Sequence, residues 1–241
     1  MKDISTYYDD FSLHYDDARD RGYHALIDDL EADCVRRWLR GERVLEVGCG
    51  TGLLLDRVRR FAPRATGMDL SGGMLARARA RGHTVCRASA LELPYRERSF
   101  DLVYSCKVLP HIEDLDRALA EVARVLDRGG VALLEFYNPQ SLRGLWKHMR
   151  WWKARVGRAS HDREVYTAYH APAEARARVL TAGLEVVGAS GIIVLTPHPL
   201  LHRIPIAGPL LRWAERALCH GPLRRWAGFY LVACRKPGAA G

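Results

Sequence analysis

Three glycines and one acidic residue are spaced in a way that could bind a nucleotide. Gly48, Gly50 and Gly52 form a GxGxG run directly after the apolar segment 43–47, and Asp69 follows Gly48 by 21 residues. Glycines let backbone N–H groups at the start of a helix approach a ligand closely, because no Cβ stands in the way. A carboxylate at the end of the next strand fits the position that binds both ribose hydroxyls of a nucleotide-containing cofactor. The pattern therefore predicts a cofactor site.

Hydrophobic periodicity predicts alternating strands and helices that would position this loop. Expected strands cover 43–47, 65–70, a segment opened by Val85, 100–105, 131–136, 184–195 and 228–235. Expected helices cover 25–39, the residues after the glycine loop, a segment capped by Ser71, 115 to the Gly129–Gly130 pair, 172–181 and a stretch near 210–219. Short βα connections indicate a mostly parallel sheet with helices on both faces. The fold class is therefore α/β.

The charge is uneven along the 241 residues, which carry 37 basic and 28 acidic side chains. Residues 1–139 have a net charge of −2, residues 140–181 of +6 and residues 182–241 of +5. The positive excess lies outside the glycine loop and its acidic partner. This excess charge therefore gives information about the substrate or a docking surface, and not about how a cofactor is bound.

Cysteine usage and the N-terminus indicate a cytoplasmic protein without a metal centre. The six cysteines are scattered singly, without the Cys/His spacing typical of zinc sites. The N-terminus lacks the apolar run of a signal peptide, and the apolar stretch 191–211 is broken by four prolines. We therefore expect no metal and no transmembrane segment. The oligomeric state is not accessible from these features.

Five motifs resemble those of class I S-adenosylmethionine (SAM)-dependent methyltransferases, in particular the small-molecule group that includes the ubiquinone/menaquinone C-methyltransferases. The similar segments are 44–52, 67–71, 93–103, 108–114 and 121–135. The resemblance implies a Rossmann-like seven-stranded sheet, six strands parallel and one antiparallel, with a basic, aromatic cap insertion. It implies one methyltransferase domain over 1–241, with a lid (1–24), a SAM-binding core (25–137), the cap or acceptor insertion (138–170) and C-terminal helices and a strand hairpin (171–241).

The resemblance also assigns cofactor contacts, with S-adenosylhomocysteine as the product. It places Glu46 and the loop residues Gly48, Cys49, Gly50 and Gly52 at the amino-acid part of SAM, Asp69 at the ribose, and Leu70 and Met74 at the adenine. In the Ser89-Ala90-Leu91 segment, Ser89 stands where the family usually has an acidic residue that contacts the adenine amino group. Lys107 follows the fourth strand, where the family contacts SAM and acceptor; the alternative is a solvated surface lysine.

The segment 7–16 resembles the family's short lid, and Arg19 follows it. Tyr15 is the lid residue we expect at the sulfonium, because an aromatic ring face attracts a cation. The alternative is an amphipathic helix that packs Phe11 and Leu13 on the domain.

His111 is the expected catalytic base, because it follows the fourth strand and imidazole titrates near neutral pH. Tyr137 and His14 are weaker alternatives, and a purely positioning role for His111 stays open. The expected acceptor residues are Tyr137, Trp146, Trp151 and Tyr166. The tryptophans could equally pack the cap onto the sheet.

The leading hypothesis is methyl transfer to a small, aromatic or lipophilic metabolite. The basic cap with tryptophans leaves open an RNA methyltransferase. A non-catalytic SAM-binding or interaction protein is a third hypothesis, in which the basic amphipathic segment 210–225 docks on a membrane surface or partner helix. Its alternative is a helix that packs Leu210 and Leu211 on the core. A nicotinamide dehydrogenase is disfavoured, because its fingerprint is GxGxxG.

Overall fold

Seven strands form one mixed sheet in the computed structural model, which describes residues 4–17, 19, 22–142, 144, 165–196 and 198–238. The strand order is β3-β2-β1-β4-β5-β7-β6. β7 pairs antiparallel with both β5 and β6, and the pairings among the first five strands are parallel. Six parallel strands and one antiparallel strand confirm the expected sheet. The strands are β1 (Val44–Val47), β2 (Thr66–Asp69), β3 (Val85–Arg87), β4 (Phe100–Ser105), β5 (Leu126–Tyr137), β6 (Glu185–Ile192) and β7 (Phe229–Arg235).

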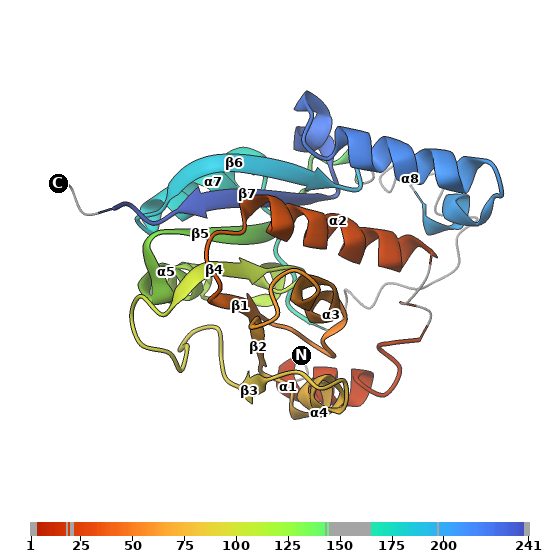
Figure 1. Cartoon of the computed structure of the whole chain (residues 1–241). Helices are drawn as coiled ribbons and strands as arrows, with labels where there is room; N and C mark the ends of the chain where they lie inside the picture. Colours follow the sequence, from red (N-terminus) through yellow and green to blue (C-terminus); the bar gives the residue numbers. More distant parts are fainter. Residues whose placement is uncertain are drawn as a thin grey trace.

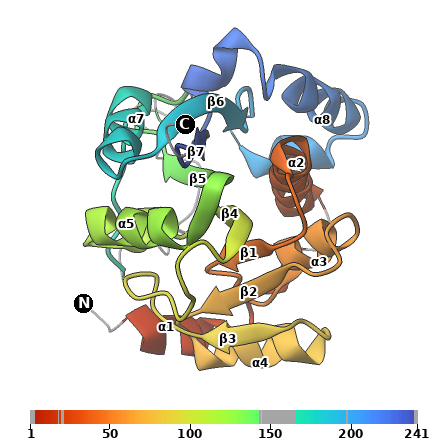
Figure 2. The ribbon, with the colours of Figure 1, turned by 60° about the vertical axis from the view of Figure 1, so that its left-hand side comes forward.

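Helices cover both faces of this sheet (Figures 1 and 2). On one face, α2 (Gly22–Trp38) and α3 (Leu53–Arg59) bury Leu30, Val35 and Leu55 against β1, β4 and β5. On the other, α5 (Leu115–Val125) and α7 (Pro172–Thr181) bury a second apolar cluster that includes Leu119 and Val179. Burial of these apolar stripes stabilises both layers.

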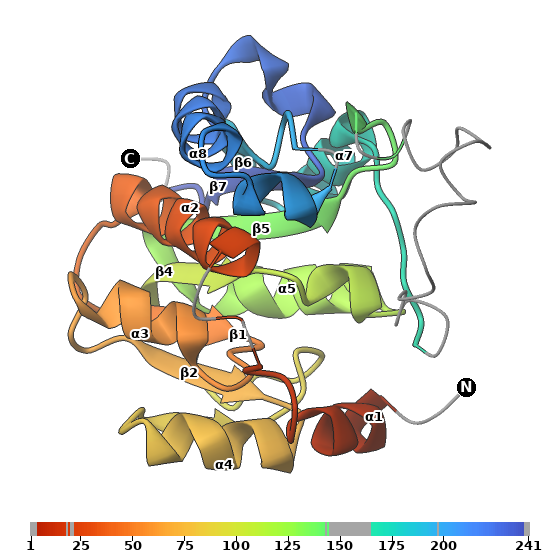
Figure 3. The ribbon, with the colours of Figure 1, turned by 90° about the vertical axis from the view of Figure 1, so that its right-hand side faces the viewer.

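The remaining helices lie at the edges of the sheet. α4 (Gly72–Ala80) packs on β2 and β3, and α1 (Ile4–Phe11) packs on α4. At the opposite edge, α8 (Ala207–Leu218) follows the short helix η3 (Pro199–Arg203) and precedes η4 (Pro222–Trp226). In Figure 3, α1 and α8 lie at opposite ends of the molecule. No helix of the described residues is long and apolar enough to cross a bilayer.

Most expected elements are found, with one clear error. β4 and α7 have the expected bounds, and Ser71 caps α4 by accepting a hydrogen bond from the Met74 N–H at 3.1 Å. The expectation that the helix from 115 runs to the Gly129–Gly130 pair is wrong, because α5 ends at Val125 and β5 already begins at Leu126. The carbonyls of Arg124 and Val125 accept hydrogen bonds from the Arg98 and Ser99 N–H groups, so they are not available to extend the helix.

Candidate functional site

The glycine loop lies at the carboxyl end of β1, where the strand order reverses between β1 and β4. Ligands of open α/β sheets bind at such a switch point. Gly48, Gly50 and Gly52 all have positive φ, at 79°, 53° and 85°. A Cβ on Gly48 would overlap Val108, and one on Gly52 would meet His83, whereas one on Gly50 would point into open space. The outer glycines therefore serve internal packing, and Gly50 leaves room for a ligand to approach.

Asp69 ends β2 and faces this loop. Its Oδ2 accepts the Gly50 N–H at 2.8 Å, and its Oδ1 accepts the Ser71 N–H at 2.9 Å. Burial raises the pKa of Asp69, and these backbone donors act in the opposite direction. The structure thus brings the expected carboxylate and glycine loop into direct contact.

A small cavity adjoins the loop. It has a volume of about 40 Å³, little more than the space of one water molecule. Among the residues expected at the cofactor, it is lined by Tyr15, Arg19, Glu46, Gly48, Cys49, Gly50 and Lys107. The Arg19 guanidinium donates to the Tyr15 hydroxyl at 2.8 Å and lies 3.9 Å from the centroid of the tyrosine ring. Tyr15 and Arg19 therefore narrow the space beside the loop.

Two aspartates fasten segment 7–16, the expected lid, to the domain. Asp9 Oδ1 accepts hydrogen bonds from Ser71 Oγ at 2.5 Å and from the Gly73 N–H at 2.9 Å. Asp16 accepts one from Thr51 Oγ1 at 2.6 Å and pairs with two arginines of the α4 region, Arg77 and Arg81. The alternative, an amphipathic helix that packs Phe11 and Leu13 on the domain, is wrong for Leu13, because its side chain is 65% exposed. Tyr7 is the buried residue of α1.

Lys107 is not a solvated surface residue. Its Nζ lies 2.8 Å from Asp28 Oδ1 and 2.9 Å from Glu31 Oε2, both on α2, and its backbone N–H donates to Glu135 Oε1 at 3.0 Å. Burial disfavours the charged ammonium, but the attraction of Glu31 and Asp28 outweighs it, so the pKa of Lys107 is raised well above its ordinary value.

Glu31 and Glu135 are fully buried beside this lysine. Burial raises the pKa of Glu31 well above its ordinary value and that of Glu135 to about 7, against the attraction of Lys107. Glu135 Oε2 has no hydrogen-bond donor among the described residues. The nearby Glu46 accepts a hydrogen bond from the Tyr104 hydroxyl at 2.9 Å, and its pKa is likewise raised by burial. Burial thus raises the pKa of three carboxyl groups in this region, of which Glu46 lines the cavity.

Sequence reasoning missed Asp28 and Glu31 as parts of this site. They lie at i and i+3 on a helix face that is otherwise apolar, with Leu26, Ile27 and Leu30 around them. Acidic residues within a buried stripe are unusual unless they have a partner. That local irregularity was the signal that could have found them.

The expected adenine residues lie outside the small cavity. Met74 is buried in the core, Leu70 is 39% exposed, and the Ser89 hydroxyl accepts the Leu91 N–H at 3.2 Å. Ala90 packs partly buried against the second apolar cluster. The structure thus brings the loop, Asp69 and the lid together, and it leaves these residues on the neighbouring surface and core.

His111 ends the short helix η1 (Leu109–His111) after β4. Its Nδ1 lies 2.9 Å from the Tyr166 carbonyl oxygen, and because a carbonyl only accepts, Nδ1 carries the hydrogen. Nε2 therefore has the free lone pair. The rings of Tyr8 and Tyr137 flank the imidazole, with centroids 6.3 and 5.8 Å away. Tyr166 contributes its backbone here, and Trp146 and Trp151 lie outside the described residues.

Two groups of side chains bring metal-ligating atoms together. Cys106 joins Glu31 and Glu135, where the Lys107 ammonium already supplies a positive charge. Cys34 and Cys219, with sulfurs 3.8 Å apart, adjoin His220. The chain positions of these cysteines are far apart, so their spacing in the sequence could not reveal the second group.

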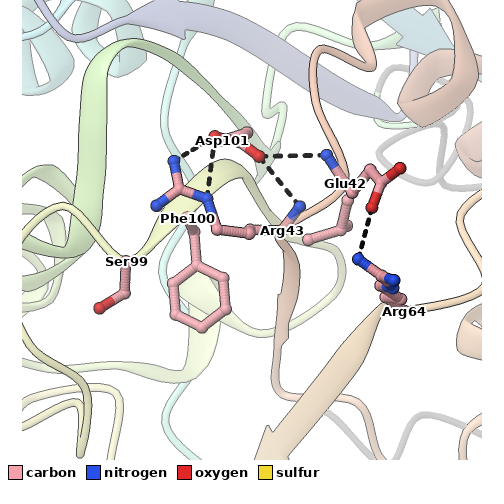
Figure 4. A pocket seen from close by; sticks show the side chains of 7 residues that line it. Glu42, Arg43, Arg64, Ser99, Phe100 and Asp101 are labelled. Atoms are coloured by element: carbon pink, nitrogen blue, oxygen red, sulfur yellow. Dashed lines mark hydrogen bonds and ion pairs between the residues drawn. The ribbon is translucent and has the colours of Figure 1, made fainter.

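A larger hollow, of about 590 Å³, lies at the amino ends of β1 and β4 (Figure 4). Its wall is dominated by ion pairs: Arg43 binds Asp101 and Asp127, and Arg64 binds Glu42 at 2.7 Å. These side chains satisfy one another near the surface. Because ligands of this architecture bind at the carboxyl ends of the strands, the hollow is a poor candidate for the chemistry.

Comparison with known proteins identifies relatives of this chain. Residues 45–134 match the methyltransferase domain family. An uncharacterized methyltransferase of Mycobacterium tuberculosis is 34% identical over 137 residues, which cover 55% of this chain and 66% of that protein. A ubiquinone biosynthesis O-methyltransferase of Methylococcus capsulatus is 26% identical over 217 residues, covering 84% of this chain and 80% of that protein.

The fold is also found among solved structures. A SAM-dependent methyltransferase from Thermotoga maritima superposes with a TM-score of 0.69 at 20% identity, over 97% of this chain and all of that one. The chain spans just under two thirds of the mycobacterial relative's own length. Residues 45–134 thus belong to the methyltransferase domain family, and the relatives named above are methyltransferases.

Proposed function

We propose that the chain transfers the methyl group of SAM to a small, lipophilic acceptor at the carboxyl ends of β1 and β4. The observation that carries this proposal is the contact between Asp69 and the glycine loop, together with the open space beside Gly50. A glycine backbone that leaves room for a ligand, next to a partly exposed carboxylate, fits an adenosine-containing ligand. SAM supplies an electrophilic methyl group on a positively charged sulfur.

The residues around the loop would each hold one part of this ligand. Asp69 would accept hydrogen bonds from the ribose hydroxyls, and the exposed Leu70 would contact the adenine, whereas the expected adenine residue Met74 is buried in the core. Tyr15 would offer its ring face to the sulfonium in place of Arg19. The cavity of about 40 Å³ is far smaller than SAM, and we propose that Tyr15 and Arg19 move apart when SAM binds. Segment 7–16, which Asp9 and Asp16 hold on the domain, would then cover the bound ligand and exclude water.

His111 would act on the acceptor. The segment that carries it touches the glycine loop, because Val108 packs where a Gly48 Cβ would stand. Its hydrogen-bonded Nδ1 leaves Nε2 to take the proton of an acceptor hydroxyl or acidic carbon as that atom attacks the methyl group. Tyr8 and Tyr137 would pack against an aromatic or lipophilic acceptor beside the imidazole.

The test combines methyl-labelled SAM, a lipophilic metabolite extract and mass spectrometry of the labelled product. We expect a labelled small molecule with the wild-type chain. In the His111→Gln variant we expect turnover to fall by about 100-fold or more, with an unchanged dissociation constant for SAM. Unchanged turnover would remove His111 from the mechanism. Binding of SAM without any labelled product would favour a non-catalytic binding protein.

A further inference from the structure

An exposed apolar stripe runs along α8, at the end of the molecule opposite α1 (Figure 3). Ile206, Leu210 and Trp213 are 84%, 62% and 69% exposed, and they recur at i, i+4 and i+7 on one helix face. Leu200 and Ile204 extend the stripe onto η3 and the following turn, at 56% and 47% exposure. Segment 195–213 holds six of the eleven large apolar side chains that are exposed among the described residues. The sequence-based alternative that Leu210 packs on the core is therefore wrong.

The opposite face of α8 explains why the stripe points outward. Glu215 is fully buried, and its carboxylate accepts the N–H groups of Val194, Leu195 and Thr196 at 2.6 to 2.9 Å. It also accepts the Thr196 hydroxyl at 2.8 Å. Four hydrogen bonds to one buried carboxylate fix the rotation of the helix about its axis. The stripe is thus held in solvent by the fold and is not a loosely packed core face.

The charges around the stripe have one sign. Residues 198–226 contain five arginines and one acidic residue, and that residue is the buried Glu215. Arg216 and Arg225 are exposed and Arg212 is half-buried. On the adjacent α2, Asp29 is paired with Arg57 at 2.9 Å and lies 3.6 Å from Arg216. The surface therefore combines exposed leucine, isoleucine and tryptophan with a surplus of guanidinium groups.

We propose that η3 and α8 form a membrane-docking surface for anionic phospholipid bilayers. An amphipathic helix with a tryptophan on its apolar face and arginines beside it lies in the interface of a bilayer, with the apolar side chains among the acyl chains and the cations at the headgroups. The same surface adjoins the start of α2, where the Tyr23 ring packs 5.4 Å from that of His202. The docked face is therefore next to the amino-terminal end of α2.

The experiment is co-sedimentation of the full chain with vesicles of phosphatidylcholine, alone or with about one third phosphatidylglycerol. It does not depend on methyl transfer. We expect binding to the anionic vesicles, weaker binding to the neutral ones, and loss of binding at about 0.5 M salt, where charges are screened. The double variant Leu210→Ser/Trp213→Ser should bind about tenfold or more weakly. Because both side chains are exposed, the variant should keep the wild-type circular dichroism spectrum and melting temperature.

Leu180→Ser is the matched control, since Leu180 on α7 is 57% exposed and lies outside the stripe. It should bind vesicles like the wild type. The proposal is overturned if the wild type binds neither kind of vesicle, or if the double variant binds as tightly as the wild type. It is also overturned if sedimentation velocity shows a dimer that the double variant abolishes while vesicle binding is absent, because the stripe is then covered by a second copy.

Discussion

The two ends of strands β1 and β4 differ in how they hold charge. At the amino ends, Arg43 bridges Asp101 and Asp127 around a hollow of about 590 Å³, and each charge is near water with an opposite partner. At the carboxyl ends, Glu46 and Lys107 line a cavity of about 40 Å³, and the buried Glu31 and Glu135 contact Lys107. The charged groups around the larger hollow are paired with one another near the surface. The carboxyl groups near the smaller cavity are buried, and burial raises their pKa values. Buried ionisable groups with displaced pKa values mark a functional end better than volume does.

Removing the Lys107 ammonium should produce the largest effect on stability. Lys107→Met leaves Glu31 buried without its cation and Asp28 with only the Arg57 guanidinium at 3.6 Å, which should lower the free energy of unfolding by about 3 kcal/mol. Lys107→Arg keeps the positive charge, and both variants keep a non-glycine residue at a position whose φ is 61°. Lys107→Arg should therefore lose clearly less stability than Lys107→Met. Urea denaturation at neutral pH measures both. A Lys107→Met protein as stable as the wild type would show that the cluster does not depend on this ion pair.

The pH dependence of stability should reveal the buried carboxyl group of Glu135. Burial raises its pKa in the folded chain to about 7, from an ordinary value of 4.5. Between these two values the unfolded chain releases this proton and the folded chain keeps it, so the free energy of unfolding falls as the pH rises towards 7. Relative to Glu135→Gln, the wild type should therefore lose on the order of 1–3 kcal/mol between about pH 5 and pH 8.

Glu121→Gln is the control for that measurement. Arg124 lowers the pKa of Glu121, so its contribution is present above the ordinary value and is lost only towards acid pH. Glu121→Gln should therefore not alter how the free energy of unfolding changes between about pH 5 and pH 8. Parallel stability curves for the wild type and Glu135→Gln over that range would contradict the raised pKa.

The amino-end ion pairs should give the smallest effect. Arg43 is about half exposed, and exposed pairs contribute little, so Arg43→Gln should cost at most about 1 kcal/mol even with two partners. It should leave SAM binding unchanged. Thermal unfolding and calorimetric titration check these two expectations. A loss of SAM affinity in Arg43→Gln would break the contrast between the two ends of the strands.

Local chemistry made part of this site predictable from the sequence. The GxGxG loop needs positive φ at its glycines, and Asp69 follows a strand, so both could be placed before the fold was known. The Ser71 cap is likewise a local hydrogen bond. Each of these features is encoded by a few neighbouring residues.

The rest depends on contacts between distant segments. Lys107 is held by Asp28 and Glu31 of α2, and Asp28 lies 79 residues earlier in the sequence. The His111 tautomer is set by the Tyr166 carbonyl, 55 residues later. The exposure of Leu210 follows from the anchoring of Glu215 to residues 194–196. Helical periodicity shows that such a helix is amphipathic, but it does not show which face is buried.

The central claim is that SAM binds at the carboxyl ends of β1 and β4, and calorimetric titration of SAM tests it most directly. Asp69→Ala should weaken binding by about 30-fold or more, because two charge-assisted hydrogen bonds are lost, and Asp69→Asn should weaken it less. Asp101→Ala, at the amino end of β4, should bind SAM like the wild type. Wild-type affinity in Asp69→Ala, or lost affinity in Asp101→Ala, would contradict the account.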